Sequence, residues 1–205
     1  MSWSPTSGAS AAAVVNPPVL VITGPSGVGK GTLIRRLLSD FPGAELSVSA
    51  TTREPRDGEV NGRDYHFLSG PEFEQRVERG EFVEHAEYAG NRYGTLRSEL
   101  QRPARLIVLE IDLQGARQVR ATMPEAEQVF IAPPGNDLGE LERRLVARGA
   151  ESADQIERRL AVAREELAAQ DEFRHKVVNT DAEEAAQELI DLAATMCVPE
   201  VRNEP

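Results

Sequence analysis

The stretch Val19-Leu20-Val21-Ile22, followed by Gly24-Pro25-Ser26-Gly27-Val28-Gly29-Lys30-Gly31-Thr32, decides the fold of this chain. Its first four residues form a short continuous apolar run, which is typical of a strand buried on both faces of a parallel sheet. A glycine-rich turn follows that run directly, and a helical pattern continues from Lys30 through Leu38. The order of strand, turn and helix predicts an α/β fold.

Similar apolar runs recur further along the chain and predict more strands of the same sheet. They are Leu106-Ile107-Val108-Leu109, Val129-Phe130-Ile131 and the shorter Val177-Val178. Helical patterns lie between and after these runs, at residues 137–148, 152–170 and 182–196. The sequence therefore predicts a parallel sheet of the P-loop NTPase type, flanked by helices and joined by right-handed crossovers.

Two regions have a texture that differs from this core. Between residues 49 and 100 glycine, arginine and tyrosine become frequent and the buried runs disappear, which predicts an insertion with a site of its own. The helices around Arg143 to Arg159 read as charged on all sides, which predicts a solvent-facing lid. We expect one domain over residues 18–197, with core segments 18–48, 101–136 and 166–197, insertion 49–100, lid 137–165, and tails at 1–17 and 198–205.

Composition and charge exclude several classes of function. The chain has 205 residues, of which 40% are hydrophobic and 28% charged, as in an ordinary globular protein. Its net charge of −11 argues against nucleic-acid polymers and anionic membranes as partners. Cys197 has no partner for a disulfide, the first basic residue is Lys30, and no apolar run could cross a bilayer. We expect a cytoplasmic protein without a secretory signal.

The glycine-rich turn has the spacing of a phosphate-binding P-loop. Glycines let backbone N–H groups converge on phosphate oxygens, and the start of the helix adds a favourable dipole. The alternative is an ordinary turn with a surface lysine, which the strand and helix on either side disfavour. We assign residues 24 to 32 to the phosphates of a nucleoside triphosphate, with Lys30 on the transferring phosphate. Gly31 stands where the motif has Ser or Thr, so direct magnesium ligation by the Thr32 hydroxyl is in doubt.

A second metal candidate follows the strand at 106–109. Asp112 comes at the carboxyl end of that run, where parallel sheets place their sites. Its carboxylate can hold Mg²⁺ directly or through water, although carboxylates at strand ends are also common on surfaces. The predicted cofactor is Mg²⁺ with Thr32 and Asp112 as candidate ligands.

A second anion site is expected in the insertion. Arg53 and Arg56 flank Pro55, and planar guanidinium groups suit bidentate recognition of phosphate. The stretch Gly58-Glu59-Val60-Asn61-Gly62-Arg63-Asp64-Tyr65 follows, and then come Glu84, Tyr93-Gly94 and Thr95. This arrangement predicts that an acceptor is bound apart from the P-loop.

These residues resemble the guanylate kinase family. The matching stretches are Ser47 to Tyr65, Gly90-Asn91-Arg92-Tyr93-Gly94, Ile131-Ala132-Pro133-Pro134 and Arg148-Gly149, and with the P-loop the resemblance runs from about Pro18 to Leu192. It implies an ATP:GMP phosphotransferase with ATP and GMP as substrates, and dGMP as a further acceptor. The oligomeric state stays open.

The resemblance also implies roles for individual residues. Arg53, Arg56, Tyr65 and Tyr93 would hold the GMP phosphate, and Ser49, Glu84 and Thr95 would read guanine with Asp112 close by. Lys30, Arg53, Arg148 and Arg159 would act on the transferring group, and Arg144 is a third lid candidate. Asn179 would touch adenine. Ordinary salt bridges for the lid arginines and a turn role for Asn179 are the alternatives.

Glu84 also has a rationale of its own. Guanine presents adjacent N–H donors on its pairing edge, and one carboxylate can accept both hydrogen bonds. Adenine has an acceptor at the corresponding ring position, so it would leave a desolvated carboxylate unpaired at a cost of about 2–5 kcal/mol. A solvated carboxylate on a helix is the alternative interpretation.

The expected chemistry needs no side-chain base, because a phosphate acceptor is largely ionised at neutral pH. Its main obstacle is the repulsion between two anions, which Lys30, magnesium and arginines would neutralise. Two other functions stay open: a non-catalytic guanylate-kinase-like interaction module, and a P-loop enzyme acting on another nucleotide. The intact P-loop argues against the first, and the separate guanine-reading cluster argues against the second.

Overall fold

The computed structural model describes residues 16–88, 90–147 and 153–197. Most of the two predicted tails, residues 1–15 and 198–205, therefore lies outside the described part of the chain. Among the described helices, none is both long enough and apolar enough to cross a membrane.

A five-stranded parallel sheet forms the core, in the order β2-β7-β1-β8-β9. The strands are β2 (Ala44–Leu46), β7 (Leu106–Glu110), β1 (Val19–Thr23), β8 (Glu127–Ala132) and β9 (His175–Val178). All five residues of β1 are buried, as a central strand with helices on both sides requires. The predicted α/β fold and its four apolar runs are confirmed.

The two outer strands differ from the sequence prediction. Val178 is 44% exposed although Val177 is buried, because β9 lies at the edge of the sheet and packs on one face only. At the other edge, β2 has three half-buried residues and too short an apolar run to stand out in the sequence.

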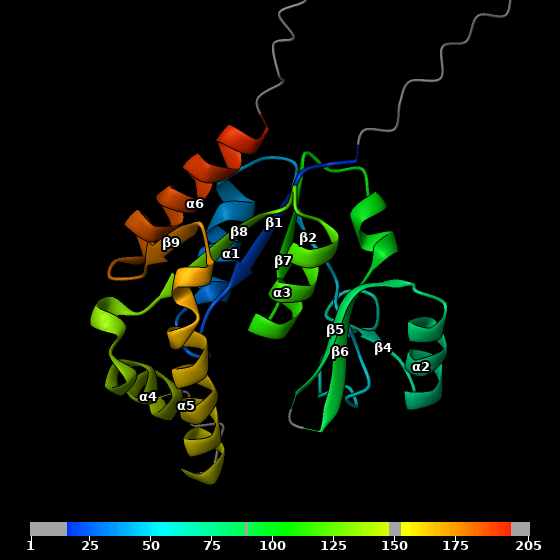
Figure 1. Cartoon of the computed structure of the whole chain (residues 1–205), viewed down its shortest axis with the longest axis horizontal. Coiled ribbons are helices and arrows are strands. Elements are labelled where there is room, and N and C mark those ends of the chain that lie inside the picture. Colours follow the sequence, from blue (N-terminus) through cyan, green and yellow to red (C-terminus); the bar gives the residue numbers. More distant parts are fainter. Residues whose placement is uncertain (1–15, 89, 148–152, 198–205) are drawn as a thin grey trace, which may run out of the picture.

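Helices cover both faces of this sheet (Figure 1). On one face α1 (Lys30–Asp40) packs against α6 (Ala182–Met196), and on the other lies α3 (Leu113–Thr122). In α1 the residues that face the core are Leu33, Ile34 and Leu37, with the spacing of one helical face. The C-terminal ends of β1 and β7 thus emerge at one edge, next to the starts of α1 and α3.

The region between residues 50 and 101 forms a second, smaller sheet in the order β4-β3-β6-β5. Its elements are β3 (Ala50–Thr51), β4 (His66–Phe67), α2 (Gly70–Glu78), β5 (Phe82–Tyr88), β6 (Asn91–Leu96) and a 3-10 turn, η1 (Arg97–Gln101). Ala50, Phe73, Phe82 and Leu96 form a separate small core. Ser69 and Glu72 start α2 with reciprocal hydrogen bonds, a capping box.

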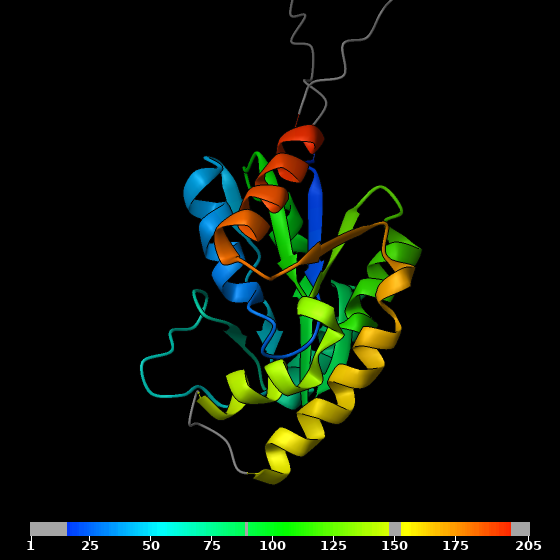
Figure 2. The same cartoon turned by 90° about the vertical axis from the view of Figure 1, so that its left-hand side faces the viewer.

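Two helices, α4 (Leu138–Ala147) and α5 (Ala153–Ala168), run side by side beyond the edge of the main sheet (Figure 2). Short 3-10 turns, η2 (Pro134–Asn136) and η3 (Gln170–Glu172), precede and follow this pair. The expectation that these helices are charged on all sides is wrong. Leu141 and Leu145 of α4 are buried, and the Leu145 side chain lies next to Gly27 of the glycine-rich turn.

Candidate active site

The glycine-rich turn has the backbone that a phosphate cradle needs. Gly24, Gly27 and Gly29 all have positive φ angles, of 138°, 87° and 103°. Residues other than glycine rarely adopt such angles. A Cβ atom on Gly24 would lie 2.3 Å from the carbonyl oxygen of Ile131 in β8, so the turn presses on the sheet backbone. The first turn of α1 contains no acidic residue, which leaves its positive dipole end available to an anion.

Lys30 folds back over this turn. Its Nζ donates hydrogen bonds to the carbonyl oxygens of Gly24 (2.5 Å) and Pro25 (3.2 Å). The ammonium group therefore lies against the glycine-rich turn, where it would meet the phosphates of a bound nucleotide.

Three segments far away in the sequence support the turn. Arg159 of α5 donates to the hydroxyl of Ser26 (2.9 Å), and Arg144 of α4 donates to the carbonyl of Val28 (3.1 Å). The buried amide of Asn179, after β9, donates to the same Val28 carbonyl (2.7 Å). Asn179 thus braces the P-loop, and its predicted contact with adenine stays a prediction.

A buried carboxylate faces the P-loop from the lid. Glu166 of α5 is 8% exposed and accepts a hydrogen bond from the backbone N–H of Ser26. Burial raises its pKa to about 7, although the positive charge of Lys30 opposes that shift. The sequence does not single out Glu166, because the charged pattern of this helix predicts that it faces solvent. The seven-residue spacing from Arg159 places both on one face of α5 and was the available clue.

Two guanine-reading candidates, Glu84 and Thr95, lie on β5 and β6, and Asp112 directly precedes α3. Glu84 is 4% exposed, and its Oε1 accepts a hydrogen bond from the buried hydroxyl of Thr95 (2.7 Å). Burial raises the pKa of Glu84 to about 7, and the nearby charge of Asp112 contributes to this shift. Asp112 caps the start of α3, where its Oδ1 accepts from the N–H of Gly115 (2.8 Å). A buried carboxylate thus lies in a site without a bonded cation among the described residues.

Arg53 is already engaged within its own loop. Its guanidinium donates to both carboxylate oxygens of Glu59 (2.8 and 3.0 Å) and to the carbonyl of Glu54 (2.7 Å). The hydrogen bond from Arg53 holds the pKa of Glu59 below its ordinary value. The Arg53 guanidinium also lies over the Tyr65 ring, 5.3 Å from its centroid.

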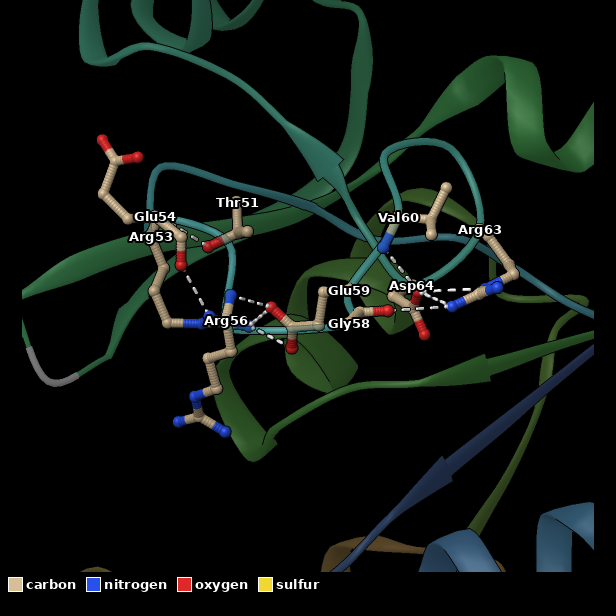
Figure 3. A network of polar contacts seen from close by, with 9 residues as sticks. All are labelled: Thr51, Arg53, Glu54, Arg56, Gly58, Glu59, Val60, Arg63 and Asp64. Carbon is tan, nitrogen blue, oxygen red and sulfur yellow. Dashed lines mark hydrogen bonds and ion pairs between the residues drawn. The ribbon is translucent and has the colours of Figure 1, made fainter.

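A second carboxylate fixes the rest of this loop. Asp64 accepts hydrogen bonds from the backbone N–H of Val60 (2.8 Å) and from the guanidinium of Arg63 (2.8 Å). Figure 3 shows both carboxylates within the loop and the Arg56 side chain leaving the network, with its guanidinium group bonded to none of the other residues drawn. The exposed Arg56 side chain is thus placed differently from the paired Arg53.

Two cavities join these groups into one site. The larger, of about 1290 Å³, lies between the insertion and α5, and its lining includes Arg53, Arg56 and Tyr93. The smaller, of about 560 Å³, is lined by residues that include Gly24, Ser26, Lys30, Ser49, Tyr65 and Glu84. Six residues line both cavities: Tyr88, Tyr93, Asp112, Arg159, Val162 and Glu166. The P-loop lysine and the predicted base reader thus face one continuous space.

Other predicted residues lie outside these linings. Thr32 is exposed, and its hydroxyl accepts a hydrogen bond from Arg35 (3.2 Å). Thr95 is buried behind Glu84 and touches the site through it. Arg148 belongs to residues 148–152, so its predicted role lies outside the described residues.

The described residues contain no cluster of three or more side chains of the types that commonly ligate metals. Asp112 nevertheless supplies a carboxylate to both cavities. Magnesium usually binds through one or two carboxylates, several waters and substrate phosphates. The residues present therefore fit a metal carried mainly by a nucleotide triphosphate.

Comparisons with known proteins identify the family. The family profile described as Guanylate kinase matches residues 16–195. A guanylate kinase from Trichormus variabilis is 52% identical over 172 residues, which cover 82% of this chain and 85% of the relative. Another from Streptomyces coelicolor is 49% identical over 179 residues, covering 86% and 90%. The crystal structure of guanylate kinase from Anaplasma phagocytophilum, 31% identical, aligns with a TM-score of 0.70 over 91% of this chain and 89% of that chain. This chain belongs to the guanylate kinase family.

Proposed function

We propose that the two joined cavities form the active site in which this guanylate kinase transfers the γ-phosphoryl group of ATP to GMP. The observation that carries the proposal is the buried carboxylate of Glu84 in the same cavity lining as Lys30. A carboxylate at 4% exposure needs donors, and the adjacent N–H groups of guanine supply two of them.

ATP would place its phosphates on the backbone N–H groups of residues 24 to 32, at the start of α1. Lys30 would then exchange its two carbonyl partners, Gly24 and Pro25, for phosphate oxygens, which are stronger acceptors. Arg159 lies next to Ser26 and lines both cavities, so it can neutralise charge on the transferring group. Arg148 and Arg144 stay candidates for the same role.

GMP would lie across the insertion. Its phosphate would meet Arg53, Arg56, Tyr65 and Tyr93, and its base would meet Glu84. Ser49 and Asp112 line the smaller cavity beside Glu84, while Thr95 orients the Glu84 carboxylate from behind. In this arrangement Arg53 acts as a fixed donor paired with Glu59, and Arg56 supplies an exposed guanidinium group that lines the larger cavity.

The reaction joins a GMP phosphate oxygen to the γ-phosphorus of ATP as the bond to the bridging oxygen breaks, which releases ADP. Because the attacking oxygen is already ionised, the protein contributes alignment and charge neutralisation. The larger cavity lies between two segments of the chain, so movement of α4 and α5 towards the insertion would close it and expel water that could otherwise hydrolyse ATP.

Phosphoryl transfer from ATP in this family depends on a divalent metal, and we propose Mg²⁺. It would be held by the ATP phosphates, by water and by Asp112, with Thr32 as a further candidate. When bound, the metal neutralises charge between the β- and γ-phosphates.

We also propose the division into core, insertion and lid that the sequence predicts, with the insertion at 49–100 and the lid at 137–165. A cytoplasmic location fits a sequence with Cys197 as its one cysteine. The net charge of −11 fits small anionic substrates bound at local arginines better than it fits a nucleic-acid polymer.

The test is a coupled assay of ADP release with ATP and a panel of nucleoside monophosphates, on the wild type and on Glu84→Gln. We expect turnover with GMP and dGMP far above that with AMP. The variant should lose about a hundredfold in the ratio of kcat/KM for GMP to that for AMP, since one amide cannot accept both N–H bonds. Glu78→Gln, an exposed position on α2, is the matched control. An unchanged ratio in Glu84→Gln would contradict the base-reading role, and a non-catalytic interaction module would release no ADP with any acceptor.

A further inference from the structure

The first turn of α3 contains a glycine that its backbone does not require. Gly115 is the third residue of this helix, is buried, and is not among the described glycines with positive φ. Glycine destabilises a helix relative to alanine, so an ordinary helical position favours alanine. A reason for glycine here must therefore lie in what surrounds it.

The space that a side chain at position 115 would take is filled by Glu84. A Cβ atom built on Gly115 would lie 2.6 Å from Oε2 of Glu84, 3.0 Å from its Cδ and 3.4 Å from its Cγ. The three nearest atoms all belong to this one side chain. The carboxylate thus rests against the bare backbone of α3, which packs beside β5 (Figure 1).

The backbone around this contact has little room to yield. The Gln118 side chain ties α3 to β5, because it accepts from the N–H of His85 (3.1 Å) and donates to the carbonyl of His85 (2.8 Å). On the other side, a Cβ atom at Gly94 of β6 would lie 2.7 Å from the carbonyl oxygen of Glu84. An added methyl group at position 115 must therefore displace the flexible end of Glu84.

An irregularity in the sheet aims Glu84 at this glycine. The register between β5 and β6 shifts between Phe82 and Glu84, so Val83 and Glu84 are both buried instead of alternating. Such bulges commonly re-aim a side chain beside a site. Phe82 packs in the small core of the insertion, whereas Val83 packs in the main core.

We propose that Gly115 is a positioning residue that determines base specificity, because its missing side chain sets how deeply the Glu84 carboxylate is seated. The same residue donates its N–H to Asp112, so both carboxylates are placed relative to one point on α3. This inference rests on the proposed reading of guanine by Glu84.

The experiment is Gly115→Ala, with thermal unfolding and steady-state kinetics for GMP, AMP and ATP. We expect KM for GMP to rise about tenfold, with a similar loss in the ratio of kcat/KM for GMP to that for AMP. The KM for ATP and the value of kcat at saturating GMP should change by less than about threefold. The Tm should stay the same or rise, since alanine favours the helix. A merely structural glycine would lower the Tm and leave base selectivity intact.

Gly70→Ala is the matched control, because Gly70 also lies in the first turn of a helix and no atom lies within 4 Å of its added Cβ. It should leave every kinetic constant unchanged. In a Glu84→Ala background, Gly115→Ala should leave KM for GMP as it is and raise the Tm, because nothing then occupies the space. If alanine at position 115 unfolds the chain even there, the obstruction is not Glu84 and the proposal is wrong.

The outcomes separate this inference from the proposed function. If Glu84→Gln loses base selectivity and Gly115→Ala keeps it, the role of Gly115 is refuted and the base reader stands. If Glu84→Gln itself keeps selectivity, the proposed function of that carboxylate fails first. A loss of base selectivity in Glu84→Ala and in Gly115→Ala, without additional loss when the two changes are combined, supports the proposal.

Discussion

The P-loop and the insertion bind anions by different physical means. Residues 24 to 30 form one continuous stretch in which glycines with positive φ turn backbone N–H groups towards a ligand, and these groups carry no formal charge of their own. The insertion uses arginine side chains, and its loop pairs Arg53 with Glu59 and Arg63 with Asp64. In the P-loop the N–H group of Ser26 is balanced by Glu166 of another segment, whereas in the insertion the charged arginines are balanced by carboxylates of their own loop.

This difference predicts that damage to the P-loop affects the chemical step and damage to the insertion affects acceptor binding. The largest expected effect is that of Lys30→Ala, which should lower kcat about a thousandfold because one donor to developing charge is lost. The matched control is Lys176→Ala, since Lys176 is the other lysine of the sequence and pairs with Asp171 outside both cavities. Circular dichroism should show both variants folded. Wild-type kcat in a folded Lys30→Ala enzyme would refute this role.

The P-loop can be predicted from the sequence more completely than the insertion. The P-loop was predicted because glycine spacing, an apolar run and a helix occur together within one stretch. In the insertion, residue types were predicted but not elements, since β3 and β4 have two residues each and β5 contains a register shift that hides its alternation. Short strands carry too few residues to show a period of two.

Residues whose roles depend on distant neighbours were missed for the same reason. In the sequence Glu166 is one of many charged residues of a helix. Only the fold brings it to the backbone N–H of Ser26, 140 positions earlier in the sequence. Gly115 looks like an ordinary helix-weakening residue until Glu84 is seen against it. Local patterns report periodicity and turn chemistry, but they contain no information on which side chain fills a given space.

Glu166 extends the comparison to stability, because this buried acid of α5 accepts a hydrogen bond from the P-loop, whereas the carboxylates of the Arg53 loop form ion pairs. With a pKa of about 7 against an ordinary 4.5, the folded state binds more protons than the unfolded state between these values. The contribution of Glu166 to the free energy of unfolding therefore falls as the pH rises from 4.5 to 7 and is constant above pH 7. The total change is about 3 kcal/mol, at about 1.4 kcal/mol per pH unit.

Glu166→Gln should remove this loss, so it should raise the free energy of unfolding at pH 8 by up to about 3 kcal/mol and have little effect at pH 5. Denaturant titrations at both pH values measure the difference. Glu157→Gln, at an exposed position of the same helix that lines neither cavity, is the control and should be neutral at both. A destabilised Glu166→Gln variant at pH 8 would show that the hydrogen bond from Ser26 outweighs burial of the charge.

The next effect concerns Arg56, an exposed arginine of the insertion that lines the larger cavity. Arg56→Ala should raise KM for GMP about tenfold to a hundredfold with little change in kcat, since a hydrogen bond to a charged group contributes about 1.5–3 kcal/mol. Arg63→Ala is the control from the same loop, because Arg63 is exposed, pairs with Asp64 and lines neither cavity. An equal rise in KM for both variants would mean that loop integrity, not the Arg56 charge, binds GMP.

The smallest expected effect is a pH dependence that belongs to the insertion alone. Base reading requires Glu84 ionised, and burial places its pKa at about 7, so protonation removes an acceptor as the pH falls below that value. Protonation of Glu84 should therefore lower kcat/KM for GMP about fivefold from pH 7 to pH 6, while KM for ATP stays level. The phosphate of GMP titrates near pH 6 as well, so the profile of Glu84→Gln serves as the reference that contains the ionisation of the substrate only. The ratio of the two profiles should decline with falling pH and level off above about pH 8. Parallel profiles would show that Glu84 does not titrate in this range, and the insertion would then hold its carboxylate charged without a bound base.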